Sequence, residues 1–263
     1  MTPYFSINAV KRNLLVFEYL LTATFMNNKY CLLLSSFSVS CILLFSLILP
    51  SISGATSPNI FPPGSKPYGL TYDKHVENFV KWALGIPAKD NPVNDQTGEK
   101  CATGQSNSNS SVFYLTFNNG GGSERVCKIP AGKGLLIPVG EVEITNKDLP
   151  NATAGELKAE AKKDQDSVNS LYLKIGNKEY NFDELKKYRT PTNVFDVDYA
   201  DNGLYGIVDG GATKAAGDGF YVITEPLQKG NYTVHYKSSL ACTDPNCAEP
   251  NFAQDIKYTI IAQ

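Results

Sequence analysis

The sequence predicts a mainly β fold, an antiparallel β-sandwich or jelly roll with two or three peripheral helices. After residue 111, apolar and polar side chains alternate in several short segments, which is the period of a β-strand. Turn residues separate these segments at short intervals, as in two-sheet sandwiches and jelly rolls. Two longer segments, 71–84 and 153–169, have apolar residues at helical spacing and interrupt the strands.

Residues 1–55 predict a leader for export. Within 26–55, a short stretch with one lysine precedes an uncharged apolar run at 30–49, and small residues end at Ala55. This order is typical of a secretory signal peptide cleaved after Ala55. An uncleaved anchor stays open, because about 20 apolar residues also span a bilayer, and Met26 is an alternative start. The positive charges before the run place the rest of the chain outside the cytoplasm in either case, secreted or at the cell surface.

Four cysteines follow the leader, and they predict two disulfides. An even number of cysteines in an exported chain is typical of a disulfide framework, and four cysteines allow three pairings. We favour the pairing that is local in sequence, which joins Cys101 to Cys127 and Cys242 to Cys247.

The charge pattern restricts the class of partner. The chain has 24 basic and 26 acidic residues, which are interspersed, so no clustered basic face for nucleic acid is expected. We expect an extracellular ligand or an envelope component as the partner, with membrane contact only through the N-terminal segment if it is not cleaved. The patterns at Asn109, Asn151 and Asn231 are candidate glycosylation sites.

The part after the leader begins with a linker and a helix. Residues 56–68 contain four prolines and predict an extended linker, and 69–263 is predicted as a single β-rich extracellular domain. Thr71 is expected to cap a helix over 71–84, and Gly85 is expected to end it.

The next segments predict strands joined by tight turns. Residues 112–117 are apolar on both faces, as in a strand that is buried on both sides. Residues 118–122 are turn residues, so 125–129 is predicted as the returning strand of a β-hairpin. A third strand is predicted at 134–139.

The remaining elements follow from capping and turn signals. Thr153 and Glu156 form the pattern of a capping box and predict a charged helix that lies outside the sheet. Gly176-Asn177 predicts a hairpin between two short strands, and a short helix is expected at 183–188. Further strands are predicted at 194–199, 219–224, 232–237 and 254–261.

Several short motifs lie between residues 62 and 240. They are Pro67-Tyr68-Gly69-Leu70-Thr71-Tyr72, Trp82-Ala83, Ile86-Pro87, Asn91-Pro92, Asp95-x-Thr97-Gly98-x-x-Cys101, Gly104-Gln105, Arg125-x-Cys127-x-Ile129-Pro130-x-Gly132-Lys133 and Asp218-Gly219-Phe220-Tyr221-Val222. Together these motifs resemble a family of uncharacterised secreted bacterial and archaeal proteins, over about residues 62–240. The resemblance implies a secreted protein and supports the Cys101–Cys127 pair, but no activity comes with it.

Glu141 and Glu143 are the candidate catalytic pair. Strand alternation puts both carboxylates on one face, about 7 Å apart along the chain. Some glycosidases use two carboxylates with different pKa values in this way. Solvated acids at the end of a strand are the favoured interpretation, because no aromatic residue flanks the pair in the sequence.

Asp196, Asp198 and Asp201 are the candidate metal ligands. Asp196 and Asp198 share one face of a predicted strand, and a turn after Asp201 could bring its carboxylate towards them. Hard oxygen ligands suit Ca²⁺, although the spacing does not match the twelve-residue calcium loop. Solvated acids are favoured here too, and no other cofactor is expected.

The sequence therefore favours an exported, disulfide-stabilised β-sandwich module of unknown ligand, with a non-enzymatic binding role or a surface role. The alternative is a secreted hydrolase that acts on polysaccharide through carboxylates such as Glu141 and Glu143.

Overall fold

The structure, a computed structural model, describes residues 56–105, 110–241 and 251–263. The predicted leader, Asn109 and the Cys242–Cys247 pair lie outside the described residues. Within them, no helix is both long enough and apolar enough to cross a membrane.

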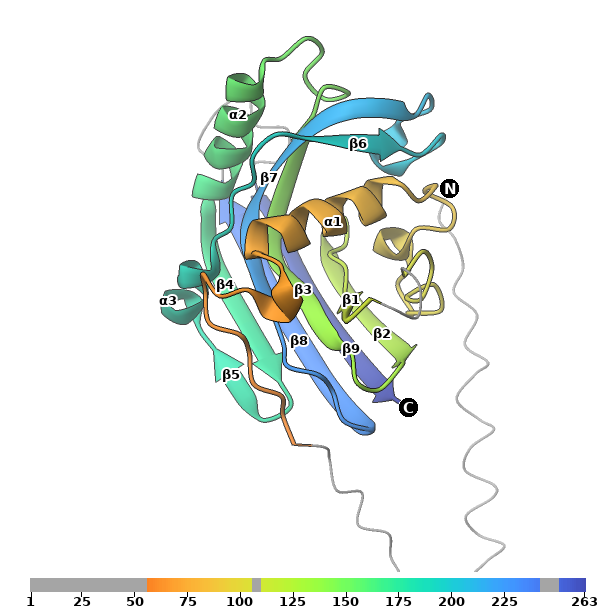
Figure 1. Cartoon of the computed structure of the whole chain (residues 1–263), viewed down its shortest axis with the longest axis vertical. Coiled ribbons are helices and arrows are strands. Elements are labelled where there is room, and N and C mark those ends of the chain that lie inside the picture. The colour runs from red at the N-terminus through yellow and green to blue at the C-terminus, as the bar shows by residue number, and fades with distance from the viewer. Residues whose placement is uncertain (1–55, 106–109, 242–250) are drawn as a thin grey trace, which may run out of the picture. The chain divides into compact units, whose positions relative to one another are not determined.

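Over the described residues the fold is mainly β, with two sheets and three α-helices, in agreement with the predicted sandwich with two or three helices (Figure 1). One sheet has the strand order β1-β3-β7-β6, and the other has the order β2-β9-β8-β4-β5. Strand β3 packs against β4 and β8, so the sheets face each other as in a sandwich. The strands are β1 Val112–Tyr114, β2 Gly121–Ile129, β3 Gly134–Thr145, β4 Val168–Ile175, β5 Lys178–Tyr180, β6 Phe195–Tyr199, β7 Gly211–Ile223, β8 Gly230–Ala241 and β9 Asn251–Ala262.

Both sheets are mixed rather than purely antiparallel. Strand β1 pairs with β3 in parallel, and β2 pairs with β9 in parallel. The predicted hairpin between the strands at 112–117 and 125–129 is therefore wrong. Residues 115–118 are buried, and they carry the chain from the first sheet to the second instead of turning it back. An apolar segment without polar alternation fits this position, because both of its sides contact the core.

The three helices have the predicted positions. Helix α1 (Tyr72–Leu84) follows Thr71 and ends at Gly85, but the Thr71 side chain makes no capping hydrogen bond. Helix α2 (Ala154–Asp166) begins with the predicted capping box, and α3 (Phe182–Leu185) is the predicted short helix. Helix α1 packs on β6 and β7, whereas α2 packs on β3 and β7.

A β-hairpin and the packing of the proline-rich segment complete the fold. Strands β4 and β5 form the predicted hairpin around Gly176. The proline-rich segment 56–68 packs on the domain, because Ile60 forms a bridge with Thr224 and the buried Ser57 hydroxyl donates to Asn177.

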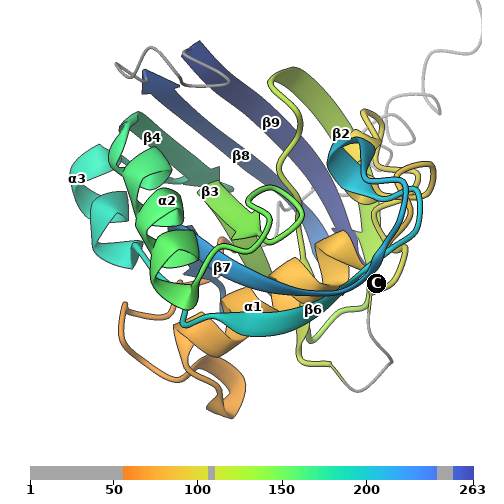
Figure 2. The same cartoon turned by 90° about the horizontal axis from the view of Figure 1, so that it is seen from above.

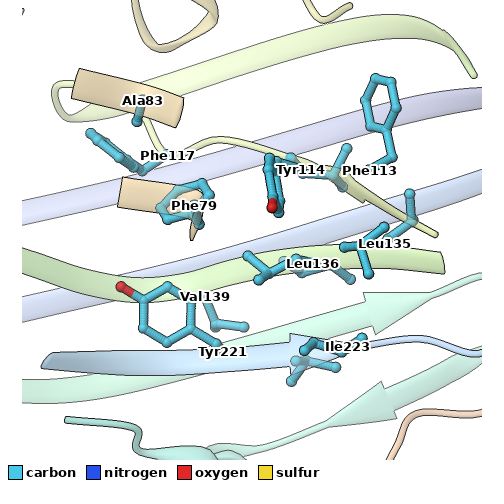
Figure 3. Packing of buried hydrophobic residues seen from close by; sticks show 14 of the residues in the cluster. Phe79, Ala83, Phe113, Tyr114, Phe117, Leu135, Leu136, Val139, Tyr221 and Ile223 are labelled. Carbon is cyan, nitrogen blue, oxygen red and sulfur yellow. The ribbon is translucent and has the colours of Figure 1, made fainter. Parts of the chain in front are cut away.

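Aromatic rings from α1 fill the space beside the first sheet. Phe79 is fully buried, and its ring lies 5.8 Å from Tyr114, 6.3 Å from Phe117 and 6.0 Å from Tyr221, measured between ring centroids (Figure 3). Trp82 is also buried and donates to the Thr103 carbonyl. These rings belong to the core, which explains the helical spacing of apolar residues in α1.

The Arg125 guanidinium is buried between the sheets, with a side chain that is only 2% exposed. Its two terminal nitrogens donate to the carbonyls of Val93, Thr116 and Phe117 and to the hydroxyls of Thr116 and Tyr258. The guanidinium also lies over the Tyr258 ring. Arg125 thereby ties β2 and β9 to the segment that crosses between the sheets, because a buried cation needs polar partners. Its Nε has no hydrogen-bond partner within the described residues.

The Cys101–Cys127 disulfide is present, as the local pairing predicts, with the two Cα atoms 6.0 Å apart. It fastens the loop after α1 to β2, where Gly98 also lies against the backbone of Val126. On the chain-entropy model, a cross-link over a sequence separation of 26 stabilises the fold by roughly 3–4 kcal/mol.

Replacing the buried cation should strongly destabilise the fold. Arg125→Met leaves the carbonyls of Val93 and Phe117 without their side-chain donor, so we expect the free energy of unfolding to fall by about 3–5 kcal/mol. Lys128→Met, an exposed position on the same strand, is the control and should change it by less than about 0.5 kcal/mol. Urea unfolding of both variants measures this, and similar losses in the two would contradict the role of Arg125.

Candidate functional site

A cleft of about 650 Å³ lies between the sheets, with walls from β3, α2, the ends of β8 and β9, and the segment after β1. Figure 2 shows how the ribbons of α2, β3, β8 and β9 are arranged when the molecule is seen from above. The sheets approach each other closely just before it. A Cβ atom on Gly140 would lie 3.1 Å from the Cβ of Ser238 and 3.2 Å from Leu171 in the opposite sheet. The cleft opens beyond this contact, where β3 continues from Gly140 to Thr145.

A β-bulge in β3 sets the orientation of the residues that follow. The register between β3 and β7 shifts between Pro138 and Gly140. The carbonyl of Val139 accepts from the buried Gln254 amide, and that of Gly140 accepts from Gln165 of α2. These two glutamines replace ladder hydrogen bonds that a bulge disrupts, so the bulge is held from both sides.

Glu141 and Glu143 both line the cleft directly after the bulge. Strand alternation places them on one face, as the sequence indicated, opposite Gly219 and Gly217 of β7. Their side chains are half-buried, and the two carboxyl groups lie close enough for each to shift the pKa of the other.

Two tyrosine hydroxyls donate hydrogen bonds to this pair of glutamates. The Tyr221 hydroxyl donates to Glu141 at 3.3 Å, and the Tyr205 hydroxyl donates to Glu143 at 2.9 Å. Gly219 makes room for the first contact: a Cβ there would lie 2.6 Å from the Tyr221 ring and 2.8 Å from the Cβ of Glu141. Only glycine lets the ring lie across the strand at that point.

Tyr205 stands at the rim of the cleft and is 54% exposed. Its φ of 56° is in the left-handed region, which is uncommon for a residue with a side chain. Such backbone strain is found at functional sites more often than elsewhere. Sequence reasoning missed both tyrosines. For Tyr221 a signal existed, namely a glycine two positions before it on the same strand face, whereas the fold alone brings Tyr205 to Glu143.

Burial and mutual repulsion change the ionisation of the pair. Burial raises the pKa of Glu141 well above its ordinary value of 4.5, and the neighbouring Glu143 charge raises it further. Burial also raises the pKa of Glu143, although hydrogen bonds from Glu141 and Tyr205 oppose the shift. Two neighbouring carboxylates do not both ionise easily, so the pair keeps a proton to higher pH than an isolated glutamate does.

Further acids line the cleft. Its described lining residues include five acids, Glu141, Glu143, Asp148, Glu160 and Asp164, and one lysine, Lys163. Lys163 forms an ion pair with Glu160 at 3.2 Å. Burial raises the pKa of Asp164, and the Glu160 charge adds to this shift. The cleft is therefore negatively charged, although basic and acidic residues are interspersed along the chain as a whole.

The candidate calcium ligands lie elsewhere, on and after β6. Asp196 and Asp198 are exposed on its outer face, and Asp196 pairs with Lys214 at 2.5 Å. The Asp201 carboxylate accepts from the Gly210 backbone. Among the described residues, no three or more His, Cys, Asp or Glu side chains are grouped so that they could hold a metal ion. Calcium binding stays a prediction.

The two histidines make structural contacts, and the two described glycosylation candidates are exposed. His75 is buried and hydrogen-bonds the Pro67 carbonyl at 2.8 Å, and His235 contacts Asp255 at 2.6 Å on the outer face of β8. Asn151 and Asn231 are both exposed, as a glycan acceptor must be, and their glycosylation stays a prediction.

Comparisons with known proteins add no family. No protein-family model matches the chain, and neither does any curated protein. A search of solved structures found the solution structure of amebosin, at 13% identity over 55% of this chain and 95% of that chain, with a TM-score of 0.15. So low a score carries no argument about fold or function.

The raised pKa values of the glutamate pair predict a pH-dependent stability. The folded protein holds the shared proton more tightly than the unfolded chain, so the stabilisation is complete below the ordinary pKa near 4.5 and is lost as pH rises through the raised values. Glu141→Gln removes one charge of the pair, so its melting temperature at about pH 8 should exceed that of the wild type by about 2 °C or more.

Melting curves between about pH 4 and pH 8 check this prediction. The control is Glu124→Gln on β2, where the acid is exposed and far from the cleft. If Glu141→Gln and Glu124→Gln follow the same pH dependence, the pair does not share a proton.

Proposed function

We propose that the chain is an exported, disulfide-stabilised β-sandwich module that binds a ligand in the cleft between its sheets and catalyses no reaction on it. The observation that carries this proposal is the cleft itself, in which polar groups converge on Glu141 and Glu143. A concave site with a few convergent polar groups of altered pKa is the usual form of a ligand site.

Export is supported by two independent features. The Cys101–Cys127 disulfide is compatible with an oxidising, extracellular location. The sequence of residues 26–55 has the order of charge, apolar run and small residues that a signal peptide requires.

The spacing of the glutamates favours binding over glycoside hydrolysis. In glycosidases the two carboxyl groups stand about 5–5.5 Å or 6.5–9.5 Å apart, on either side of the bond that breaks. Here the two carboxyl groups interact directly on one face of β3 instead of standing on either side of a bond. The hydrolase remains the second candidate on one observation: a carboxyl group whose pKa is raised by burial is suited to general acid catalysis.

A ligand screen on the natively exported protein separates the two functions. The intact mass of that protein should first show that residues 1–55 are absent. We then expect compounds that raise the melting temperature of the wild type and of the control Asp196→Asn/Asp198→Asn, but not of Glu141→Gln/Glu143→Gln. Both double variants replace two carboxyl groups with amides of the same shape, so a difference between them reports the cleft.

Two results would contradict the proposal. Ligands that stabilise all three proteins equally would place the site outside the cleft. Turnover of a polysaccharide panel by the wild type, abolished in Glu143→Gln, would establish the hydrolase instead.

A further inference from the structure

We infer that the ligand of this cleft is an organic cation, an ammonium group with several N–H donors on an apolar body. This inference rests on the proposed function, because it names the chemical class that the same cleft takes. It comes from three properties of the walls: their unused hydrogen-bonding capacity, their charge and their apolar surface.

The first property is a surplus of acceptors. The amide of Asn118 donates to the Gly121 carbonyl and to Ser123, and that of Gln254 donates to Val139 and Ser238. The hydroxyls of Tyr205 and Tyr221 donate to the glutamate pair. A carboxylate has about four lone-pair sites, so Glu141 and Glu143 keep acceptor capacity after these contacts. A ligand that matches this cleft must bring donors.

The second property is charge. Five acids and one lysine line the cleft, and the lysine is paired with Glu160. Even with one proton on the glutamate pair, the balance is negative. A cation is therefore attracted into the cleft, whereas a carboxylate or phosphate ligand would be repelled.

The third property is the apolar wall, which distinguishes an organic cation from a metal ion. Val142 and Ile144 of β3 line the cleft together with Phe252 and Leu240, and the Tyr205 ring is exposed at its rim. A bare ion would leave these groups in water and would fill little of about 650 Å³. Aliphatic or aromatic carbon attached to the ammonium group would cover them, and an aromatic face also attracts the cation.

Binding of the cation should displace the shared proton. The ammonium group takes the place of the proton between Glu141 and Glu143, and the proton leaves to the buffer. Affinity then rises with pH, by up to about tenfold per pH unit, until the pair is fully ionised. The charged groups near the pair are Asp148, Glu160, Lys163 and Asp164, and the neighbouring hydroxyls are those of Tyr199, Tyr205, Tyr221 and Tyr236.

Isothermal titration calorimetry on the native protein tests the inference. The probes are butylamine, 1,4-diaminobutane and 2-phenylethylamine, and each is paired with the alcohol of the same carbon skeleton. We expect at least one amine to bind about tenfold or more tightly than its alcohol. Its affinity should rise from about pH 5 to about pH 8, and titrations in two buffers of different ionisation enthalpy should show proton release.

Variants connect this binding to the glutamates. Glu141→Gln/Glu143→Gln should weaken the amine by about tenfold or more and abolish the proton release. The control Asp196→Asn/Asp198→Asn, on the outer face of β6, should change the affinity by less than about twofold. The glutamine variant keeps the shape of the side chains and removes a repulsion, so it is expected to fold.

The remaining outcomes overturn the inference in distinguishable ways. Equal affinity for an amine and its alcohol would contradict the organic cation, and so would binding of a neutral oligosaccharide or of calcium chloride when no amine binds. In these cases the cleft remains a binding site if the glutamine variant loses that binding. If no amine, alcohol, oligosaccharide or calcium binds, the inference fails together with the proposed function.

Discussion

The burial of one cation, the Arg125 guanidinium, is the constraint on which the arrangement of the two sheets depends. A charge taken out of water is costly unless polar atoms surround it. In the described part of the chain, its partners are carbonyl and hydroxyl oxygens from Val93, Thr116, Phe117 and Tyr258 rather than carboxylates. Residues from β2, from β9, from the segment that crosses between the sheets and from the loop after α1 must therefore come together at this point, and only the native crossing of the chain brings them together.

The cleft follows from that crossing. Thr116 and Phe117 are held by Arg125, and the next residues, Asn118 and Asn119, form one wall of the cleft. Gly140 brings the sheets into close contact, and the bulge before it turns Glu141 into the cleft. Gln165 from α2 and Gln254 from β9 hold that bulge. The core thus contains one buried positive charge. The nearby cleft contains the carboxyl groups of Glu141 and Glu143, whose mutual repulsion keeps the pair partly protonated.

Much of the fold could be predicted from local signals, because those elements depend on near neighbours in the sequence. The capping box at Thr153 and Glu156, the end of α1 at Gly85 and the hairpin at Gly176 are all of this kind. The parallel pairing of β2 with β9 could not be predicted in this way. Its partners are more than 100 residues apart, and an alternating strand shows which face is buried but not which strand lies beside it.

The candidate site likewise combines features that local sequence patterns predict with features that only the fold determines. Alternation along β3 was enough to place Glu141 and Glu143 on one face. It could not show that the pair lies in a cleft, because Tyr205 arrives from a distant loop and Tyr221 from β7. Strand β7 is also longer than its predicted core at 219–224, since the small residues of 211–219 give no apolar alternation. Glycine and alanine there make space for other residues, and that role is visible only in three dimensions.

The most direct test of the account is a pH titration of the side-chain carboxyl carbons of Glu141 and Glu143 by NMR. The account predicts two coupled transitions, one of them well above the ordinary pKa near 4.5, and a return of the remaining carboxyl towards that value when its neighbour becomes glutamine. Two independent transitions near 4.5 would show that both groups are solvated strand-end acids. The cleft would then lose the property on which its proposed role depends.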